Sequence, residues 1–370
     1  MRVTLISDPM AQRMPGRSPY YEALKTKLAT QVDLSAKVMA APWARTAETQ
    51  SIVHNVGLSV VRSVRRHILT IDDLGYRAPR RLNNGDVRLQ RLFQLREARL
   101  RGDIVVVPSE YGRTDLKSMD FRSRNIRVIP PGPPNWASPA AQRWLKQTQQ
   151  QQLAPHQNPA VVAHSASGIQ RLTRWNVLNR HAPQPKRELP AAPYIVVFAN
   201  RGKWSNLLMA MEGLNYAAPD IPHHVVVVGD RVYAAAQYRE YLQVLPNLKN
   251  RTQFWEQNEP IEMARLIAHA DAAVATNIFD LGCSNVIGCL HLGTSVVIPA
   301  SSSAEDFVTS GPASVTVDPT AAVGIEAGIL ELLARDPQER RANALAQAKN
   351  YSWDKTAQEY VSLYNEIGKA

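Results

Sequence analysis

The chain has 370 residues, of which 45% are hydrophobic and 20% charged, as in soluble globular proteins with two domains of ordinary size. Its longest apolar runs have the length of strands, which excludes a transmembrane helix from the expected elements. The net charge of +11 is uneven, because residues 1–150 carry 25 Lys and Arg against 12 Asp and Glu, whereas residues 151–370 carry 18 against 20. The first half, at +13, should therefore attract an anionic partner.

Two features predict a cytoplasmic protein. The strand pattern begins at Val3, with no signal-peptide apolar region before it. The two cysteines, Cys283 and Cys289, fit no zinc-ligand spacing, and we expect them to be buried free thiols rather than a functional pair.

Strand-like and helix-like segments alternate along the first half of the chain. Helical spacing predicts helices over residues 19–30 and 88–101, the second with leucines and Phe93 on one face and arginines on the other. Short β-branched runs, typical of a parallel sheet buried on both faces, predict strands at residues 3–7, 67–71, 104–107 and 126–129.

The stretch from Asn135 to Pro193 interrupts this alternation. It contains the glutamine run 149–152 and several prolines, a composition typical of a linker or a surface excursion. Trp144 and Trp175 nevertheless indicate that parts of it pack onto another element.

The alternation resumes in the second half. Strands are predicted at residues 194–198, 224–228, 251–255, 272–275 and 295–298. Helices are predicted at residues 205–216, 259–269, 321–333 and 353–367. Two such β/α halves give two parallel sheets, with a crevice where the carboxyl ends of their strands meet.

Five motifs follow one another along the chain. They are residues 70–74 (TIDDL), 102–116 (GDIVVVPSEYGRTDL), 125–132 (NIRVIPPG), 270–297 (ADAAVATNIFDLGCSNVIGCLHLGTSVV) and 351–360 (YSWDKTAQEY). In this order they resemble the motifs of the retaining, family-four glycosyltransferases of the GT-B fold. The resemblance covers the whole chain except its Gln- and Pro-rich middle.

The resemblance implies an α/β protein of the GT-B fold, with two Rossmann-like, doubly wound domains facing a central crevice. We expect four segments: an acceptor-side domain over residues 1–134, the linker or surface excursion over 135–193, a nucleotide-sugar domain over 194–350, and a C-terminal helix over 351–370 that crosses back onto the first domain.

The implied donor site begins at Asp280, which stands where the family has a Glu facing the transferred sugar. Its alternative role is that of a helix N-cap, the commonest task of an Asp before a helix. Backbone N–H groups of the following residues would bind the diphosphate of the donor: Gly282, Cys283, Ser284 and Asn285.

Two further parts of the donor site depart from the family pattern. Asn200 and Ser205 replace an Arg and a Lys, so the positive charge for the departing diphosphate would come from Arg201 and Lys203; the alternative is a solvated basic loop. Gly288 replaces the family's second Glu, which binds the ribose hydroxyls, so a nucleotide is held otherwise here or held more weakly.

The resemblance also places residues around the nucleobase and the phosphates. Gly229, Trp255 and Glu256 would lie near the base, where Trp255 either stacks on it or packs in the core. Gly16 and Arg17 follow the first strand, and Arg17 either reaches a phosphate or is an ordinary loop arginine.

Asp72 and Asp73 end a strand that faces the crevice. One of them would orient an acceptor hydroxyl, or both cap local backbone; Asp72 stands where the family has His. We read the isolated His54 as structural. No metal-ligand cluster appears, in line with the family's usual metal independence, so the nucleotide sugar is the only co-substrate expected and no cofactor is implied.

The segment from Arg77 to Arg101 is strongly basic, and three interpretations remain open. It docks on an anionic membrane as the acceptor-side surface, it contacts an acidic protein or a second copy, or it is a solvated face. Nucleic acid is not expected, because aromatic residues are not interleaved with the basic ones. The arginines concerned are Arg77, Arg80, Arg81, Arg88, Arg91, Arg96, Arg99 and Arg101.

Two functions follow from the resemblance and its departures. The first is a hexosyltransferase-type glycosyltransferase that moves a sugar from a nucleotide donor to a glycan, lipid-linked or protein acceptor, with retention, in the cytoplasm or at the inner face of the membrane. The second is a glycosyltransferase-like protein without catalysis, which serves as a partner subunit or a glycan-binding protein. Asp72, Asn200, Ser205 and Gly288 motivate the second hypothesis, since four family positions deviate together.

Overall fold

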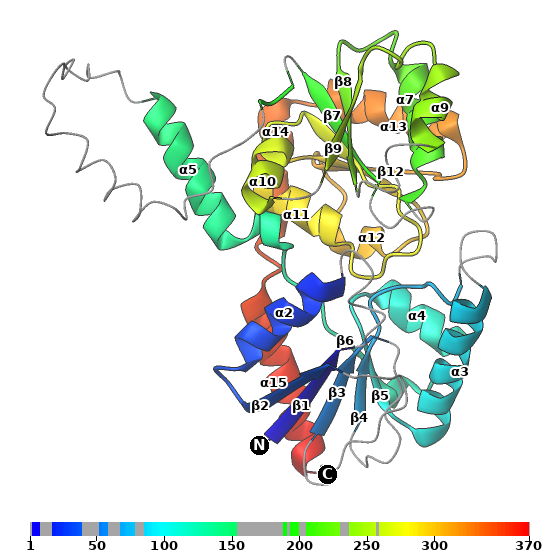
Figure 1. The fold of residues 1–370 in the computed structure, drawn as a ribbon, viewed down its shortest axis with the longest axis vertical. Coiled ribbons are helices and arrows are strands. Elements are labelled where there is room, and N and C mark those ends of the chain that lie inside the picture. Colours follow the sequence, from blue (N-terminus) through cyan, green and yellow to red (C-terminus); the bar gives the residue numbers. More distant parts are fainter. Residues whose placement is uncertain are drawn as a thin grey trace, which may run out of the picture.

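The β-branched runs form two parallel sheets, one in each half of the chain, and Figure 1 shows the two domains stacked one above the other. The structure is a computed structural model, and it describes residues 2–7, 17–38, 52–57, 67–77, 85–153, 188–190, 193–199, 205–229, 237–256 and 259–369.

The first sheet has six strands in the order β2-β1-β3-β4-β5-β6, and all neighbouring strands are parallel. The strands are β1 (Arg2–Ser7), β2 (Asp33–Val38), β3 (Ile52–Val56), β4 (His67–Thr70), β5 (Ile104–Val107) and β6 (Ile126–Val128). The helices of this domain are α2 (Arg17–Leu28), α3 (Gly85–Arg101), α4 (Glu110–Ser118) and the 3-10 turn η2 (Ser123–Asn125).

The second sheet also has six parallel strands, in the order β12-β11-β10-β7-β8-β9. The strands are β7 (Tyr194–Phe198), β8 (His224–Gly229), β9 (Thr252–Glu256), β10 (Ala272–Val274), β11 (Val296–Pro299) and β12 (Ser314–Val317). The helices are α7 (Leu207–Ala217), α9 (Gln237–Gln243), α10 (Pro260–Ala268), α11 (Ser284–Leu292), α12 (Ala304–Phe307), α13 (Ala322–Ala334) and α14 (Pro337–Ala348).

Alternating side chains of the central strands are buried on both faces of each sheet. In β7, Val196 and Phe198 pack towards α10 and α11, whereas Ile195 and Val197 pack towards α7 and α13. Successive side chains of a strand point to opposite faces, so a continuous apolar run such as this one is needed where helices cover both.

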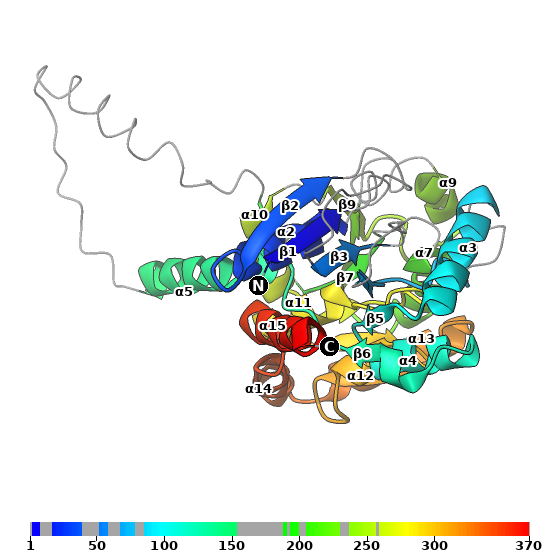
Figure 2. The same cartoon turned by 90° about the horizontal axis from the view of Figure 1, so that it is seen from below.

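The segment between the two sheets, expected as a linker or a surface excursion, is largely helical in its first part. It contains η3 (Asn135–Ala137) and α5 (Pro139–Leu153), which begins on the second domain and projects away from both sheets in Figures 1 and 2. Glutamine is a good helix former, so the run over 149–152 is compatible with the end of α5. Trp175 lies outside the described residues.

The last helix, α15 (Trp353–Lys369), covers the first sheet, where Ala357, Tyr360 and Leu363 are buried against α2 and the strands. Its start crosses the segment that leaves β6. Trp353 donates from Nε1 to the Pro133 carbonyl at 2.8 Å, and an added Cβ at Gly132 would lie 2.4 Å from the Trp353 backbone N. Glycine is therefore required where these two connections between the domains pass each other.

The strands and helices predicted from periodicity are confirmed to within a few residues, and several elements were missed. In β3, the buried His54 and Asn55 interrupt the apolar run. The strand β2 lies at a sheet edge, and polar residues alternate with apolar ones along it: Asp33, Ser35 and Lys37. Buried polar residues and edge strands both weaken the sequence signal of a strand. The missed helix α14 had a signal, because Asp336 and Pro337 form a typical helix start.

Candidate functional site

The order of strands in the second sheet locates a candidate site between β7 and β10. Successive connections run outward in opposite directions from these two adjacent strands, and ligands of open α/β sheets bind outside the carboxyl ends at such a switch point. The segments that follow β7 and β10 in sequence are residues 199–206 and 275–283, where the resemblance placed the donor site. Arg201 and Lys203 belong to the first segment but lie outside the described residues.

Strained backbone gathers at the same end of the sheet. Among the described residues, four other than glycine have positive φ, and three of them lie in the connections that follow β7, β10 and β11: Asn206 (54°) and Cys283 (43°) directly before a helix, and Ser301 (52°) three residues before one. A left-handed residue costs about 1–2 kcal/mol, and such strain concentrates at functional sites. The geometry therefore singles out the carboxyl ends of these three strands.

Asp280 lies at this end with 5% of its surface exposed. Its carboxylate accepts hydrogen bonds from the backbone N–H groups of Gly282 and Cys283, both at 3.2 Å. The side chain thus closes the turn before α11. It is not the helix N-cap of its alternative role, because Cys283 occupies that position and no side chain caps the helix there. It also engages two of the N–H groups expected to bind a diphosphate.

Behind Asp280 there is little free space. A cavity of about 10 Å³, enough for roughly one water molecule, is lined by Phe198, Asn277, Asp280, Cys283 and Asn285, among others. Ser284 is the first residue of α11, and Asn285, the second, is 8% exposed. Cys283 and Cys289 are buried free thiols, as expected, and burial raises the pKa of Cys289.

The two domains meet directly at the predicted aspartates. Asp73 and Asp280 form an isolated antiparallel bridge, in which Leu74 N–H donates to the Phe279 carbonyl at 2.9 Å and Leu281 N–H donates to the Asp72 carbonyl at 3.2 Å. The structure therefore brings Asp280 to the adjacent residues Asp72 and Asp73, from which more than 200 residues separate it in sequence. We call the paired segments, residues 71–77 and 277–283, the interdomain bridge.

A buried ion pair fixes the first-domain side of the interdomain bridge. Arg91 of α3 donates from Nη1 to Asp73 Oδ1 at 2.8 Å, and the Gly75 N–H donates to the same oxygen at 2.7 Å. Both charged side chains are at least 94% buried. A charge buried this deeply requires such a partner. We therefore interpret Arg91 as a residue of the candidate site. The sequence had indicated Arg91 only as one member of the basic segment.

A chain of buried polar side chains runs from the interdomain bridge under α15. His54 Nδ1 lies 2.6 Å from the Tyr364 hydroxyl and His54 Nε2 lies 2.7 Å from Thr70 Oγ1; Thr70 continues to Tyr360 (2.8 Å) and Tyr360 to Tyr20 (3.0 Å). Burial lowers the pKa of His54 to about 3. Burial, with smaller contributions that include the charge of Asp72, raises the pKa of Tyr20 and of Tyr360. His54 thus has the structural role that was expected.

A second contact joins the domains beside the bridge. The Ser109 and Ser303 hydroxyls are 2.9 Å apart, and the Tyr111 N–H at the start of α4 donates to the Asp306 carboxylate at 2.7 Å. A helix N-terminus favours a carboxylate, so α4 holds an acidic side chain of α12 across the interface.

The position of the family's ribose-binding Glu is packed against an indole. Gly288 lies in the middle of α11, and an added Cβ there would lie 2.2 Å from Cη2 of Trp136. Trp136 is 4% exposed and stacks on Phe198, with ring centroids 6.2 Å apart and planes at 21°. Glycine is therefore required for packing at this position, a reason that the sequence alone does not reveal.

The structure describes the remaining predicted site residues only in part. Trp255 is 2% exposed and belongs to the apolar core around Trp136, which corresponds to its core-packing alternative. Gly229 ends β8, where an added Cβ would lie 3.0 Å from Cβ of Ala199. Glu256 ends β9 and Arg17 begins α2, but neither side chain is described; Gly16 lies outside the described residues.

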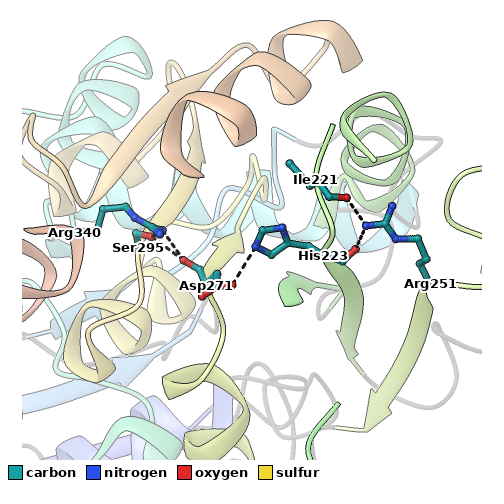
Figure 3. Close-up of polar contacts among 6 residues, drawn as sticks. All are labelled: Ile221, His223, Arg251, Asp271, Ser295 and Arg340. Carbon is teal, nitrogen blue, oxygen red and sulfur yellow. Dashed lines mark hydrogen bonds and ion pairs between the residues drawn. The ribbon is translucent and has the colours of Figure 1, made fainter. Parts of the chain in front are cut away.

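The polar cluster at the opposite end of the second sheet has a structural role (Figure 3). Arg340 Nη1 donates to the Asp271 carbonyl at 2.6 Å and to Ser295 Oγ at 2.8 Å, and Arg251 donates to the carbonyls of Ile221 and His223. His223 Nε2 lies 3.0 Å from the Asp271 carboxylate, and burial lowers the pKa of His223. These contacts satisfy backbone carbonyls at the amino ends of β8 and β10 and the Ser295 hydroxyl at the amino end of β11, away from the interdomain bridge.

In the part of the chain that the structure describes, no group of three or more His, Cys, Asp or Glu side chains is arranged to hold a metal ion. Nor does any described helix combine the length and the apolar character needed to cross a bilayer.

No protein-family model matches the chain, and no curated protein matches it significantly. Solved structures do. A sucrose-phosphate synthase of Thermosynechococcus elongatus superposes with a TM-score of 0.67 at 14% identity, covering 99% of both chains. HepE of Anabaena, solved with UDP-glucose, gives 0.63 at 14% identity and covers 99% of this chain and 100% of that one. WaaG, a glycosyltransferase of lipopolysaccharide biosynthesis, gives 0.64 at 10% identity, with 98% and 99% covered. The expected GT-B fold is confirmed over the whole chain.

Proposed function

We propose that the chain is a glycosyltransferase that uses a nucleotide sugar. The observation that carries the proposal is the convergence of Asp72, Asp73 and Asp280 at the switch point of the second sheet, where strained residues precede the helices α7, α11 and α12. HepE, of the same fold, has been solved with UDP and with UDP-glucose, which supports this class of ligand.

In this proposal the second domain binds the donor and the first binds the acceptor. Arg201 and Lys203 supply positive charge to the departing diphosphate, and the N-termini of α7 and α11 add the partial positive charge of their helix dipoles. Asp280 faces the sugar, with Asp72 or Asp73 orienting the acceptor hydroxyl. The configuration of the sugar is retained, no metal takes part, and the acceptor is a glycan, a lipid-linked sugar or a protein.

The Asp280 carboxylate accepts from the N–H groups of Gly282 and Cys283 through a single oxygen, Oδ1. A movement of the carboxylate towards the sugar would free those two donors for the diphosphate. One rearrangement of the turn before α11 therefore supplies both parts of the site, and binding of an anionic donor favours it because the donor replaces the carboxylate.

Calorimetric titration with UDP, GDP and UDP-glucose tests the proposal. We expect at least one of them to bind, and the double variant Arg201→Ala with Lys203→Ala to lose that binding and the turnover while its circular dichroism is unchanged. Arg143→Ala with Lys146→Ala, on the exposed face of α5, removes the same charge elsewhere and is the matched control. Normal turnover in the first double variant would contradict the assigned roles.

A second candidate function rests on the packing at Gly288. Trp136 fills the space where a ribose-binding side chain would project, and Asp280 engages N–H groups that a diphosphate would need. Both features suit a glycosyltransferase-like partner subunit or glycan-binding protein without catalysis. Absence of binding to every nucleotide and nucleotide sugar tested, even at high concentration, would favour this candidate over the first.

A further inference from the structure

Helix α13 is apolar on almost its whole circumference, although it lies at the surface of the second domain. Between Ala322 and Ala334 it contains two polar side chains, both of them glutamates. Ile325 and Leu332 are fully buried in the core of the domain, whereas 65% of the surface of Val323 is exposed. A surface helix needs only one apolar face to pack on its own domain, so the outward apolar face of α13 calls for a partner.

Helix α7 extends this surface. Leu208, Glu212 and Tyr216 follow one another at intervals of four residues and so lie on one side of α7, where Leu208 is 49% and Tyr216 41% exposed. The two helices are in close contact, because an added Cβ at Gly213 would lie 2.8 Å from the Ala322 carbonyl oxygen. We call the outward residues of the two helices the α7–α13 face: Leu208, Glu212, Tyr216, Val323 and Glu326.

The α7–α13 face is negatively charged. Its two helices contain three glutamates and no Lys or Arg. Glu331 pairs with Arg335, whereas in the described part of the chain no Lys or Arg forms an ion pair with Glu212 or Glu326. The Tyr216 hydroxyl donates to Glu212 at 2.9 Å, and this hydrogen bond, together with the charge of Glu212, raises the pKa of Tyr216. A partner of this face must therefore present apolar and positively charged side chains together.

Helix α3 of the first domain has this complementary character. Leu89, Phe93 and Leu100 lie on its outward side with 57%, 55% and 66% of their surface exposed, at spacings of four and seven residues that return to one side of a helix. Arg96, between the last two, is also exposed. The surrounding segment, residues 77–127, contains 13 Lys and Arg against 6 Asp and Glu, a net charge of +7. We call Leu89, Phe93, Arg96 and Leu100 the α3 stripe.

The α7–α13 face and the α3 stripe hold most of the exposed apolar side chains of the protein. Of the eight large apolar side chains that are exposed among the described residues, six lie on α3, α7 and α13. Because both surfaces are exposed in the single chain, they do not cover each other. Pairing of either surface with itself would oppose like charges, whereas pairing of one with the other brings arginine to glutamate.

The positions of the two surfaces suit a closed assembly of two copies. Figures 1 and 2 show α3 and α7 on the same side of the molecule, one in each domain. Rotation of a second copy by 180° about an axis between the domains would therefore place each α3 stripe on the α7–α13 face of the other copy. Each contact then occurs twice, and no surface is left open for further copies.

We propose that two copies of the chain associate in opposite orientations, with the α3 stripe of each copy packed on the α7–α13 face of the other. The association does not depend on the proposed transfer reaction. It can therefore be tested without a nucleotide, and failure of either proposal leaves the other intact.

Light scattering coupled to size-exclusion chromatography tests the proposal with the full chain. We expect a mass of twice the 41.1 kDa of one chain at micromolar concentration, and weaker association in added salt. Leu208→Ser with Val323→Ser should raise the dissociation constant of the dimer at least about tenfold, because two apolar side chains are lost from each of two contacts. Leu345→Ser, at an exposed leucine of α14 on the other side of the molecule, is the control and should leave the dissociation constant unchanged (Figure 1).

Reversal of charge identifies which surfaces meet. Arg96→Glu alone and Glu212→Lys with Glu326→Lys should each weaken the dimer, and the chain that carries all three changes should recover part of the loss. Circular dichroism verifies that every variant is folded. A monomeric unaltered chain would overturn the proposal, and so would an undiminished dimer of the Leu208/Val323 variant. A triple variant weaker than both of its parents would show that the two surfaces do not pair, which would also overturn it.

Discussion

The two sheets have the same number of parallel strands, but different kinds of contact hold helices on them. On the first sheet, α15 and α2 are joined to the strands by the buried chain of His54, Thr70, Tyr360 and Tyr20. The central strands of the second sheet contact their helices through apolar side chains on both faces, and a polar cluster binds backbone at the strands' amino ends (Figure 3). The first domain should therefore respond to pH, and the second mainly to lost packing.

The largest effect is expected from a cavity in the apolar core of the second domain. Trp136→Ala removes a buried indole that packs on Gly288 and Phe198 and should lower the free energy of unfolding by about 4 kcal/mol. Urea denaturation followed by circular dichroism measures this change. Trp144→Ala, at a half-buried tryptophan on α5, is the control and should cost much less; equal costs would mean that the Trp136 site collapses around the cavity.

A matched pair of arginine variants separates the two ends of the fold. Arg91→Ala leaves Asp73 buried without the Arg91 counter-charge, at a cost of about 3 kcal/mol. Arg340→Ala removes the guanidinium donor from Ser295 Oγ and from the Asp271 carbonyl, which keeps only the Ser295 hydroxyl, at a cost of about 2 kcal/mol.

Only the Arg91 variant should also lower the rate of the proposed transfer, because only Arg91 positions the interdomain bridge. Steady-state kinetics under conditions where both variants remain folded would show this, with partial recovery in Arg91→Lys. If the Arg91 and Arg340 variants lost activity equally, Arg91 would have no special role in positioning the interdomain bridge.

The largest single contribution to the pH dependence of stability should come from His54 in the first domain, beside smaller ones of the same sign from His223 and His291, whose pKa burial also lowers. The folded chain keeps His54 neutral down to about pH 3, whereas the unfolded chain takes up a proton below its ordinary pKa of about 6.5. The free energy of unfolding should therefore fall as the pH drops below about 6.5, by about 1.4 kcal/mol per unit, or about 2 kcal/mol at pH 5.

His54→Gln should flatten this dependence, because glutamine does not titrate in this range. Urea denaturation near pH 7.5 and near pH 5 provides the measurement, and His269→Gln, at an exposed histidine, is the control that should keep the full slope. An unchanged slope in the His54 variant would show that other groups dominate.

The smallest effect concerns a local cap in the second domain. Asp336 accepts hydrogen bonds from the N–H groups of Gln338 and Glu339, both at 2.9 Å, so Asp336→Ala should cost about 1 kcal/mol. Asp220→Ala, at an exposed aspartate outside any helix, should cost almost nothing in the same denaturation experiment. A loss well above about 1 kcal/mol in the Asp336 variant would show that α14 is coupled to the rest of the domain.

Local chemistry explains which parts of the structure the sequence could predict. β7 and β8 are apolar runs that can only be buried strands, and the turn between β10 and α11 was located from its residue types. β3 was missed because His54 and Asn55 are polar residues within the strand. The burial of His54 is made acceptable only by its tertiary partners Tyr364 of α15 and Thr70 of β4.

The candidate site was predictable in position but not in detail. Asp72, Asp73 and Asp280 could each be placed at a strand end, and their meeting follows from two sheets facing each other. The pairing of Asp73 with Arg91 and the packing of Trp136 on Gly288 join residues distant in sequence, and no local pattern encodes such contacts.

The position of α15 has a consequence for how the protein is made. Tyr20 and Tyr360 are in contact although 340 residues separate them, so the first domain completes its core with a helix that is synthesised after the whole second domain. The second domain, whose sheet and helices come from one continuous stretch, can fold before that helix has emerged from the ribosome. The first domain in sequence is thus the later one to close, and the apolar face around Leu5 and Ile68 stays uncovered until α15 is available.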